Sequence, residues 1–455
     1  MRTHSTHTQV EQAADKPAHI NAIHFVGVER TKRSFLESAI QRALQARTLG
    51  DVVTETHNAV ADLMGLDIFE AAEIHFDRAK GPGSLGDGLH GGMDAIVSLR
   101  ERKRWWARTG TEVGNGEGSL SGSIAVRNAL GNAERLSADV AFGTRTSSAF
   151  LLAFSKPLGA SPNRWLDLQA HQALRNNSLY SSHDERVRGL LARYRFLSPL
   201  VGKQEIWWEG AWRNVHRVTD QASLSVREDA GHSVKSAIGH SWTLDTRDDP
   251  FMPTSGASLR LLTELAGANG VLGGDVDFLK NELEAQASYS PRKGWILTST
   301  LRAGHLLSSP LARLSSSSFS SSGPCRTRIN DRFFLGGPMT LRGFAVNGVG
   351  PQDGKDAIGG DIYAAAGLSL FTPLPRVETE AFKGHLFANA GSLRSISPQD
   401  QVKSLIATPS SAVGLGLVYR HSVARIEMNF CLPITATSTD RIKSGVQFGL
   451  GISFL

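Results

Sequence analysis

Cysteines and long apolar runs are the scarcest features of this 455-residue chain. It has two cysteines, Cys325 and Cys431. Two are too few for a disulfide framework or for a four-ligand zinc site built on cysteine. No stretch approaches the ~18 consecutive apolar residues that a membrane-spanning helix needs. A membrane protein is still compatible with this sequence, because a strand of a membrane barrel needs only about ten alternating residues.

Enzyme motifs are also missing. The glycines of Gly114–Gly118 lack the third-glycine spacing of a dinucleotide site, and residues 350–355 (GPQDGK) are one residue too short for a phosphate-binding loop. Neither GxSxG nor HExxH occurs. We therefore predict no catalytic residue, cofactor, metal site or nucleic-acid partner. The net charge of +6 suits an anionic membrane surface or an acidic client, and it is also common in solvated loops.

The N-terminal part has mixed helix and strand patterns. Residues 1–20 lack the apolar core of a secretory signal, and we expect a disordered tail over residues 1–17. Strand patterns at residues 19–28, 72–76 and 93–99 enclose two helical patterns, the first after a capping-box spacing at Ser34 and Glu37 and the second over Asp51–Met64. The order β-α-α-β-β predicts a small α+β domain over residues 18–102.

From Trp105 onward the apolar residues recur with a period of two. A soluble sandwich would alternate in the same way. Three features favour a membrane barrel with a wet lumen: charges on the polar side, frequent Gly and Ser, and tryptophans at strand ends, at 105–106, 207–208 and 295. About 350 residues, at about 20–24 residues per strand and connection, predict about 16 antiparallel strands over residues 103–455.

One segment inside this region departs from the alternation. Asp331–Gly350 (DRFFLGGPMTLRGFAVNGVG) holds five glycines and a proline, which exclude a long regular helix. It carries more large apolar groups than a solvated loop normally does, with Arg342 among them. The loop is either tucked inside the barrel, with the guanidinium on a fixed acceptor, or an ordinary buried loop with a snorkelling arginine. Because a 16-stranded barrel has a wide lumen, we expect residues 324–355 to fill it as a lid loop.

These motifs carry a family resemblance. DRFFLGGPMTLRGF, followed by Gly350-Pro351-Gln352, resembles the lid-loop signature of the POTRA-bearing barrel-assembly superfamily. DTRDDPFMPTSG (245–256), LFTPLP (370–375) with HLFANAG (385–391), ARIEMNFCLPI (424–434) and GVQFGLGISFL (445–455) are similar to later barrel motifs of that superfamily, in the same order. A single POTRA-like domain, the lack of a secretory signal and the LGGP form of the loop look like the mitochondrial sorting and assembly machinery branch.

The resemblance implies a lid-loop motif of Leu341, Arg342, Gly343 and Phe344. It also implies a facing patch of barrel wall formed by Phe387, Asn389 and Gly391. Bacterial relatives carry an acidic residue where this chain has Asn389. That departure argues against an ion pair at this position and leaves a neutral hydrogen bond from Arg342 to the Asn389 side-chain oxygen, which is weaker than a bidentate carboxylate pair.

The resemblance further implies an insertase that folds β-barrel precursors, such as mitochondrial porin, into the mitochondrial outer membrane. The chain would cross that membrane many times, with its POTRA domain in the intermembrane space, and its partners would be outer-membrane lipid and peripheral subunits of the machinery. Because edge strands are templates for further pairing, clients would enter at a lateral gate between the first and last strands. The expected gate residues are Ala107, Thr109, Thr111 and Val113, with Val446, Phe448, Leu450 and Ile452.

Two questions stay open at this stage. Lys443, Gly445, Phe448 and Leu450 fit the β-signal pattern by which such barrels are themselves recognised, although the small residues nearby are equally explained as lumen-facing. The rivals to the insertase are a protein-translocating channel, a passive diffusion pore and, with less support, an outer-membrane barrel hydrolase.

Overall fold

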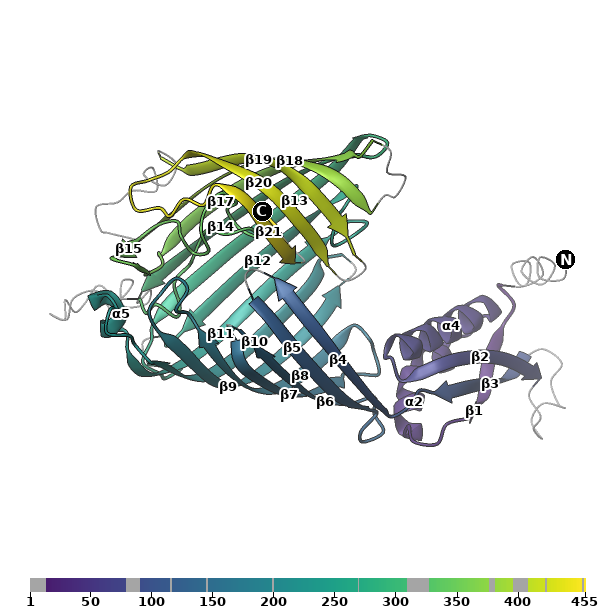
Figure 1. The fold of residues 1–455 in the computed structure, drawn as a ribbon. Helices are drawn as coiled ribbons and strands as arrows, with labels where there is room; N and C mark the ends of the chain where they lie inside the picture. The colour runs from purple at the N-terminus through teal and green to yellow at the C-terminus, as the bar shows by residue number, and fades with distance from the viewer. Residues whose placement is uncertain are drawn as a thin grey trace, which may run out of the picture.

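The chain forms a small α+β region joined to a large antiparallel sheet that curves into a barrel (Figure 1). The computed structural model describes residues 14–78, 91–114, 117–144, 146–198, 200–268, 270–308, 327–375, 381–395, 408–421, 424–451 and 454–455. Most of the expected N-terminal tail, the start of the lid loop at 324–326 and Ile452 lie outside these residues. Within the described residues, no helix is both long and apolar enough to cross a bilayer.

The α+β region packs three helices on one three-stranded sheet. Its elements are β1 (Ala18–Val26), α2 (Arg33–Ala39), α3 (Gln41–Gln45), α4 (Leu49–Gly65), β2 (Phe69–Arg78) and β3 (Gly91–Glu101). β3 is central, parallel to β1 and antiparallel to β2. The Thr48 hydroxyl caps α4 by accepting a hydrogen bond from the Asp51 amide at 3.2 Å. α4 buries Val60 and Leu63 in a cluster with Val97 of the sheet.

The expected capping box before the first helix is wrong. α2 begins at Arg33 after Lys32, which makes no side-chain capping bond. Glu37 instead forms an exposed ion pair with Arg33, at 2.8 Å and one helical turn apart. The capping-box spacing is present in the sequence, but the helix starts two residues too early to use Ser34 as its cap.

The barrel is a single 16-stranded sheet, which confirms the predicted strand number and fold class. Each strand pairs with its sequence neighbour in the antiparallel sense, so that β4 and β21 are the two edges. A two-stranded hairpin, β15 (Gln352–Asp353) with β16 (Asp356–Ala357), forms at the end of the lid loop, and α5 (Leu224–Glu228) follows β10. The sixteen strands are β4 (Trp105–Gly114), β5 (Glu117–Arg127), β6 (Arg135–Gly143), β7 (Thr146–Pro157), β8 (Arg164–Asn176), β9 (Asp184–Ser198), β10 (Gly202–His216), β11 (Gly231–Asp245), β12 (Gly256–Ala266), β13 (Phe278–Arg292), β14 (Trp295–Ser308), β17 (Ile362–Pro373), β18 (Phe382–Arg394), β19 (Ser410–Arg420), β20 (Arg425–Thr435) and β21 (Gly445–Gly451).

The pleat of each strand sends neighbouring side chains to opposite faces. On β10, Arg213 is buried inside the barrel, whereas Trp208 and Trp212 are each 42% exposed on the outside. Trp207 therefore points inward, and its ring covers Gly239, where an added Cβ would lie 2.1 Å from a ring atom. The interpretation of paired tryptophans as an outer girdle is thus wrong for Trp207, because two adjacent strand residues cannot both face lipid.

The α+β region is fastened to two turns of the barrel. The Lys32 amide donates to the Gly131 carbonyl at 2.8 Å, and the Asn128 side-chain amide donates to the Thr31 hydroxyl at 2.8 Å. Ala133 and Ala160, from the β5–β6 and β7–β8 turns, join the apolar cluster of the α+β region. These contacts make the junction a packed interface rather than a simple tether.

Glu101, the last residue of β3, anchors this junction. Its carboxylate accepts hydrogen bonds from the Thr31 amide and hydroxyl at 2.9 and 2.7 Å and from Arg30 Nε at 2.8 Å. Although burial raises the pKa of Glu101, the hydrogen bonds from Thr31 and Arg30 outweigh that effect and hold it below its ordinary value. Because the pKa of Glu101 is lower in the folded state than in the unfolded state, its ionised carboxylate stabilises the junction.

We expect Glu101→Gln to loosen the junction by about 1–3 kcal/mol, because the donors of Thr31 and Arg30 lose a charged acceptor. Faster hydrogen exchange of the amides around Thr31, in the full-length protein, would measure this. Since the folded-state pKa is lowered, the stabilisation is present above the unfolded pKa of about 4.3 and is lost as pH falls through the folded value. The control is Glu37→Gln in the exposed Arg33–Glu37 pair, and equal exchange in the two variants would contradict the prediction.

Candidate functional site: the lid loop and the seam

The lid loop enters the lumen between β14 and β17 and packs against the inner wall. Phe333 in the loop and Gly360, just after it, exchange two backbone hydrogen bonds of 2.9 Å. Its apolar side chains share one buried cluster with inward-facing residues of the barrel. The loop members of that cluster are Phe333, Leu335, Leu341, Phe344 and Val349. This packing explains why the loop carries an apolar composition that a solvated loop would not tolerate.

The first charged anchor of the loop lies on β10. Asp331 and Arg213 form an ion pair of 2.6 Å, and each side chain is 5% exposed. Next to it, the Ile329 amide donates to Asp229, which follows α5. The beginning of the described loop is therefore held against the β10–β11 side of the barrel.

The second anchor is Arg342, in the middle of the loop. Arg342 is 1% exposed, and its Nε and Nη2 donate to Glu427 Oε2 of β20 at 3.1 and 2.8 Å. Its Nη1 donates to the main-chain oxygen of Leu455. The guanidinium lies over the rings of Phe387 and Phe454, 5.1 and 5.6 Å from their centroids. These contacts compensate the desolvation of the buried cation.

Glu427 is shared between two arginines. Its Oε1 lies 2.7 Å from Nη2 of Arg425, and its Oε2 also accepts from the Asn429 amide at 2.8 Å. The Phe454 ring lies between the two cations, 4.3 Å from the Arg425 guanidinium. Asn429 in turn bonds His385 at 2.8 Å, and His385 bonds Ser369 at 3.0 Å. A network of polar side chains thus extends from the loop across the inner faces of β20, β18 and β17.

The wall residues named from the resemblance lie beside this network. Phe387 stacks under Arg342, Asn389 is buried on the inner face of β18, and an added Cβ at Gly391 would lie 3.0 Å from Leu335 of the loop. Arg342 does pair with a carboxylate of the barrel wall, but not at the position of Asn389. The carboxylate comes from Glu427, two strands away from Asn389. In the sequence, Glu427 is visible as part of the polar face of the penultimate strand, with Arg425 and Asn429.

The loop is also bonded directly to the last strand. The Gly343 amide donates to Gln447 Oε1 at 3.1 Å, and Gln447 Nε2 donates back to the Phe344 carbonyl at 3.1 Å. The Lys443 amide donates to the Gly343 carbonyl at 2.9 Å. Gly343 has φ +89°, and a Cβ there would lie 2.7 Å from Cβ of Ala412, so this close approach requires glycine.

The first and last strands border the seam of the barrel (Figure 1). In the described part of the chain, no ladder of hydrogen bonds joins β4 to β21. Val446 and Phe448 of β21 are 65% and 51% exposed, and Leu450 is on the same outer face. Ala107, Thr109 and Thr111 of β4 also face outward, because they pair with the exposed row of β5. Val113 belongs to β4, and Ile452 lies outside the described residues.

The residues with the spacing of a β-signal lie at the start of β21. Gly445 has φ +95°, a conformation that side-chain-bearing residues rarely adopt, although the space around it is open. Phe448 faces outward, whereas Lys443 lies before the strand and bonds the lid loop. The motif therefore spans both the loop contact and the seam.

Fold and site together define a lidded barrel of the outer-membrane type. The chain matches the Omp85 superfamily domain over residues 128–454. It is 36% identical over 449 residues to a SAM50-like protein of Schizosaccharomyces pombe, covering 96% of this chain and 91% of that protein. It is 34% identical over 451 residues to the sorting and assembly machinery component 50 homolog of Bos taurus, covering 97% and 91%. Within the Omp85 superfamily, the chain belongs to the sorting and assembly machinery component 50 family.

A solved structure supports the fold independently. BamA from Haemophilus ducreyi lacking POTRA domains 1–3 superposes with a TM-score of 0.77 at 16% identity, over 95% of this chain and 84% of that one. At this identity the likeness concerns the fold alone. The family model and the curated relatives confirm the family expected from the motifs, and with it the prediction that the chain is not an enzyme.

Because Glu427 pairs with two arginines, we expect two substitutions in this cluster to differ in the stability that they cost. Arg342→Ala removes one cation and leaves Glu427 paired with Arg425, so we expect the lid loop to become protease-sensitive while the barrel stays assembled. Glu427→Gln leaves two buried guanidinium groups without a carboxylate, so we expect a larger loss, in the range of about 3–5 kcal/mol for a broken buried pair. Thermal unfolding in detergent and protease protection of the loop measure both. Equal or reversed effects would contradict the shared-carboxylate interpretation.

Proposed function

We propose that this chain folds β-barrel precursors and inserts them into the mitochondrial outer membrane at the seam between β4 and β21. The observation that carries the proposal is that the sheet ends at these two strands, which lie side by side and, over the residues that the structure describes, share no ladder. The names of the relatives, sorting and assembly machinery components, agree with it. The proposed clients include precursors of mitochondrial porin, and the proposed partners are peripheral subunits of the machinery and outer-membrane lipid.

The driving force would be backbone pairing. An unpaired amide or carbonyl in hydrocarbon costs several kcal/mol, whereas the net gain from a hydrogen bond formed in water is about 1 kcal/mol. An edge strand at a membrane-embedded seam therefore binds a client strand far more strongly than the same edge would in water. The client buries its apolar face in lipid at the same time, so that neither a nucleotide nor a covalent step is needed.

The two strands that border the seam are attached to different parts of the molecule. β21 is bonded to the loop through Gln447, and β20 is bonded to it through Glu427. β4 instead follows the α+β region after only three residues, 102–104. We infer that this region is the POTRA domain and lies in the intermembrane space, where it would present clients to β4. A loop that fills part of the lumen favours insertion over a passive pore.

Site-specific crosslinking distinguishes lateral insertion from passage through the lumen. A photoreactive residue at Thr109 or Val446, both on the outer side of the seam, is expected to crosslink an arrested barrel precursor. The matched control is His171 on the inner wall, which lies 3.8 Å from Glu209. Crosslinks confined to the His171 position would favour a translocating channel and overturn the gate assignment.

The β-signal assignment has its own test. Gly445→Val forces a β-branched residue into φ +95°, and Phe448→Ala removes the large apolar group of the motif, so we expect both variants to integrate poorly when imported into isolated mitochondria. Val446→Ala, on the same strand but outside the motif, should integrate normally. Carbonate-resistant integration of Gly445→Val and Phe448→Ala at the wild-type level would refute the signal.

A further inference from the structure

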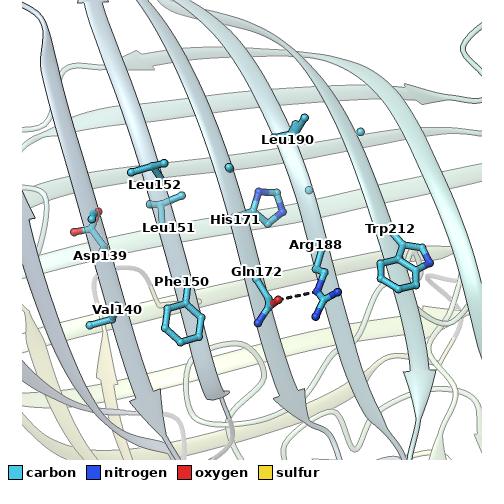
Figure 2. Close-up of a pocket in the computed structure, with 14 residues that line it drawn as sticks. Asp139, Val140, Phe150, Leu151, Leu152, His171, Gln172, Arg188, Leu190 and Trp212 are labelled. Atoms are coloured by element: carbon cyan, nitrogen blue, oxygen red, sulfur yellow. Dashed lines mark hydrogen bonds between the residues drawn. The ribbon is translucent and has the colours of Figure 1, made fainter.

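A groove crosses the outer face of the barrel over β6 to β10, away from the seam (Figure 2). Its volume is about 640 Å³. One row of paired residues across these strands alternates between small and large side chains. The row is Ala138, Leu152, Ala170, Leu190 and Gly210. The small residues leave space between the two leucines, and that space forms the floor of the groove.

An arginine lies in the adjacent row of the same face. That row runs through Val140, Phe150, Gln172, Arg188 and Trp212. Val140, Phe150 and Trp212 are 38–42% exposed on the outside of the barrel. Because cross-strand partners share a face, Arg188 also points out of the barrel, toward the space that lipid occupies around a membrane-embedded sheet. A cation there differs from the charges of the lumen, which are paired across the inner wall.

Arg188 is oriented by two neighbours. Its Nε donates to Gln172 Oε1 at 2.7 Å, and its guanidinium lies 5.5 Å from the ring centroid of Trp212 (Figure 2). The Trp212 ring is itself stacked on His232, with centroids 5.1 Å apart. These contacts fix the plane of the guanidinium without using its two terminal nitrogens. That pair of parallel donors is the group that binds a phosphate in bidentate fashion.

The depth of Arg188 suits a headgroup. It lies four residues from the start of β9, at the end of the barrel remote from the α+β region. With a rise of ~3.3 Å per residue and a tilt of ~45°, that places it roughly 10 Å below the strand end. The outward positions that follow on β9 are Leu190, Ala192, Tyr194 and Phe196, which are apolar or aromatic. Arg188 therefore lies at the border of the apolar band that is remote from the α+β region.

The charges around the groove have one sign. Arg186 is the next outward position on β9, so that two cations follow each other on this face. Of the residues that line the groove, Asp139 is the single carboxylate, and its place in β6 faces the lumen. An exposed arginine is strongly destabilising at the membrane midplane and much less so near the interface. A bound anion would reduce what remains of that cost.

We propose that this groove binds one anionic phospholipid, with its phosphate on Arg188 and Arg186 and an acyl chain over Ala170 and Gly210. The site is independent of the insertion mechanism, because it needs only that the outer face of β6–β10 meets lipid. A lipid held there would fix the height of the β8–β10 wall in the bilayer. This part of the wall continues into the strand that bears Arg213, the first anchor of the lid loop.

The test uses the full-length protein in nanodiscs of phosphatidylcholine with phosphatidylglycerol as the minor component. Native mass spectrometry of protein released from the discs should show retained phosphatidylglycerol enriched over its share of the bilayer. Arg188→Gln should reduce this retention about tenfold, the effect of losing one charge-assisted contact. Ala170→Leu, which fills the groove from the outer face, should also reduce it. Arg292→Gln, at the exposed end of β13, is the matched charge control.

Three results would overturn the proposal. The first is equal retention of phosphatidylcholine and phosphatidylglycerol by the wild-type protein. The second is unchanged retention in Arg188→Gln when circular dichroism shows that the variant is folded. The third is displacement of the lipid by excess inorganic phosphate, which would identify a simple anion site without a role for the acyl chain. If the wild-type protein retained the lipid but did not insert precursors, the result would count against the proposed function and not against the lipid site.

Discussion

The carboxylate of Glu427 is the interaction on which the arrangement of lid and seam depends. It lies in the barrel interior between Arg342 and Arg425 and compensates both cations at once. Taking two guanidinium groups out of water is expensive, and a single fixed anion with stacked phenylalanine rings offsets that cost only if the geometry is kept. The loop is therefore held in one position, and the same group ties it to the penultimate strand.

This constraint divides the barrel into two unequal parts. The lid loop is anchored at Arg213 of β10 and at Glu427 of β20, and its apolar side chains pack on strands from β11 to β19. The inner wall of β8 to β12 carries charges that pair with one another across strands, such as Asp167 with Arg195 and Lys235 with Glu264. The loop also bonds the start of β9, where the Asn330 side-chain amide donates to Glu185 at 2.5 Å, so the strands braced by the loop run from β9 to β21.

The barrel architecture could be predicted from the sequence, but the carboxylate that anchors Arg342 could not. Alternation with period two, the residue count and the lid-loop motif led to about 16 strands and to the correct family, because these signals are local. Arg342 was recognised as central for the same reason. Its carboxylate partner was missed because Glu427 is 85 residues away in the chain, and the path of a loop inside a lumen is not encoded in local periodicity. The girdle interpretation failed at Trp207, where the pleat alone would have placed two adjacent tryptophans on opposite faces.

The two strands of the seam are held by different parts of the molecule. β21 is fixed to the lid loop, since the Gln447 side chain both accepts from and donates to the backbone of Gly343 and Phe344. β4 follows directly from β3, whose last residue, Glu101, is bonded to Thr31 and through it to Asn128 of the barrel turn. A displacement of the α+β region therefore acts on β4, whereas a displacement of the lid acts on β21. Because the described residues of the two strands share no ladder, β4 and β21 are positioned by the junction and by the lid loop respectively, and not by backbone hydrogen bonds to each other.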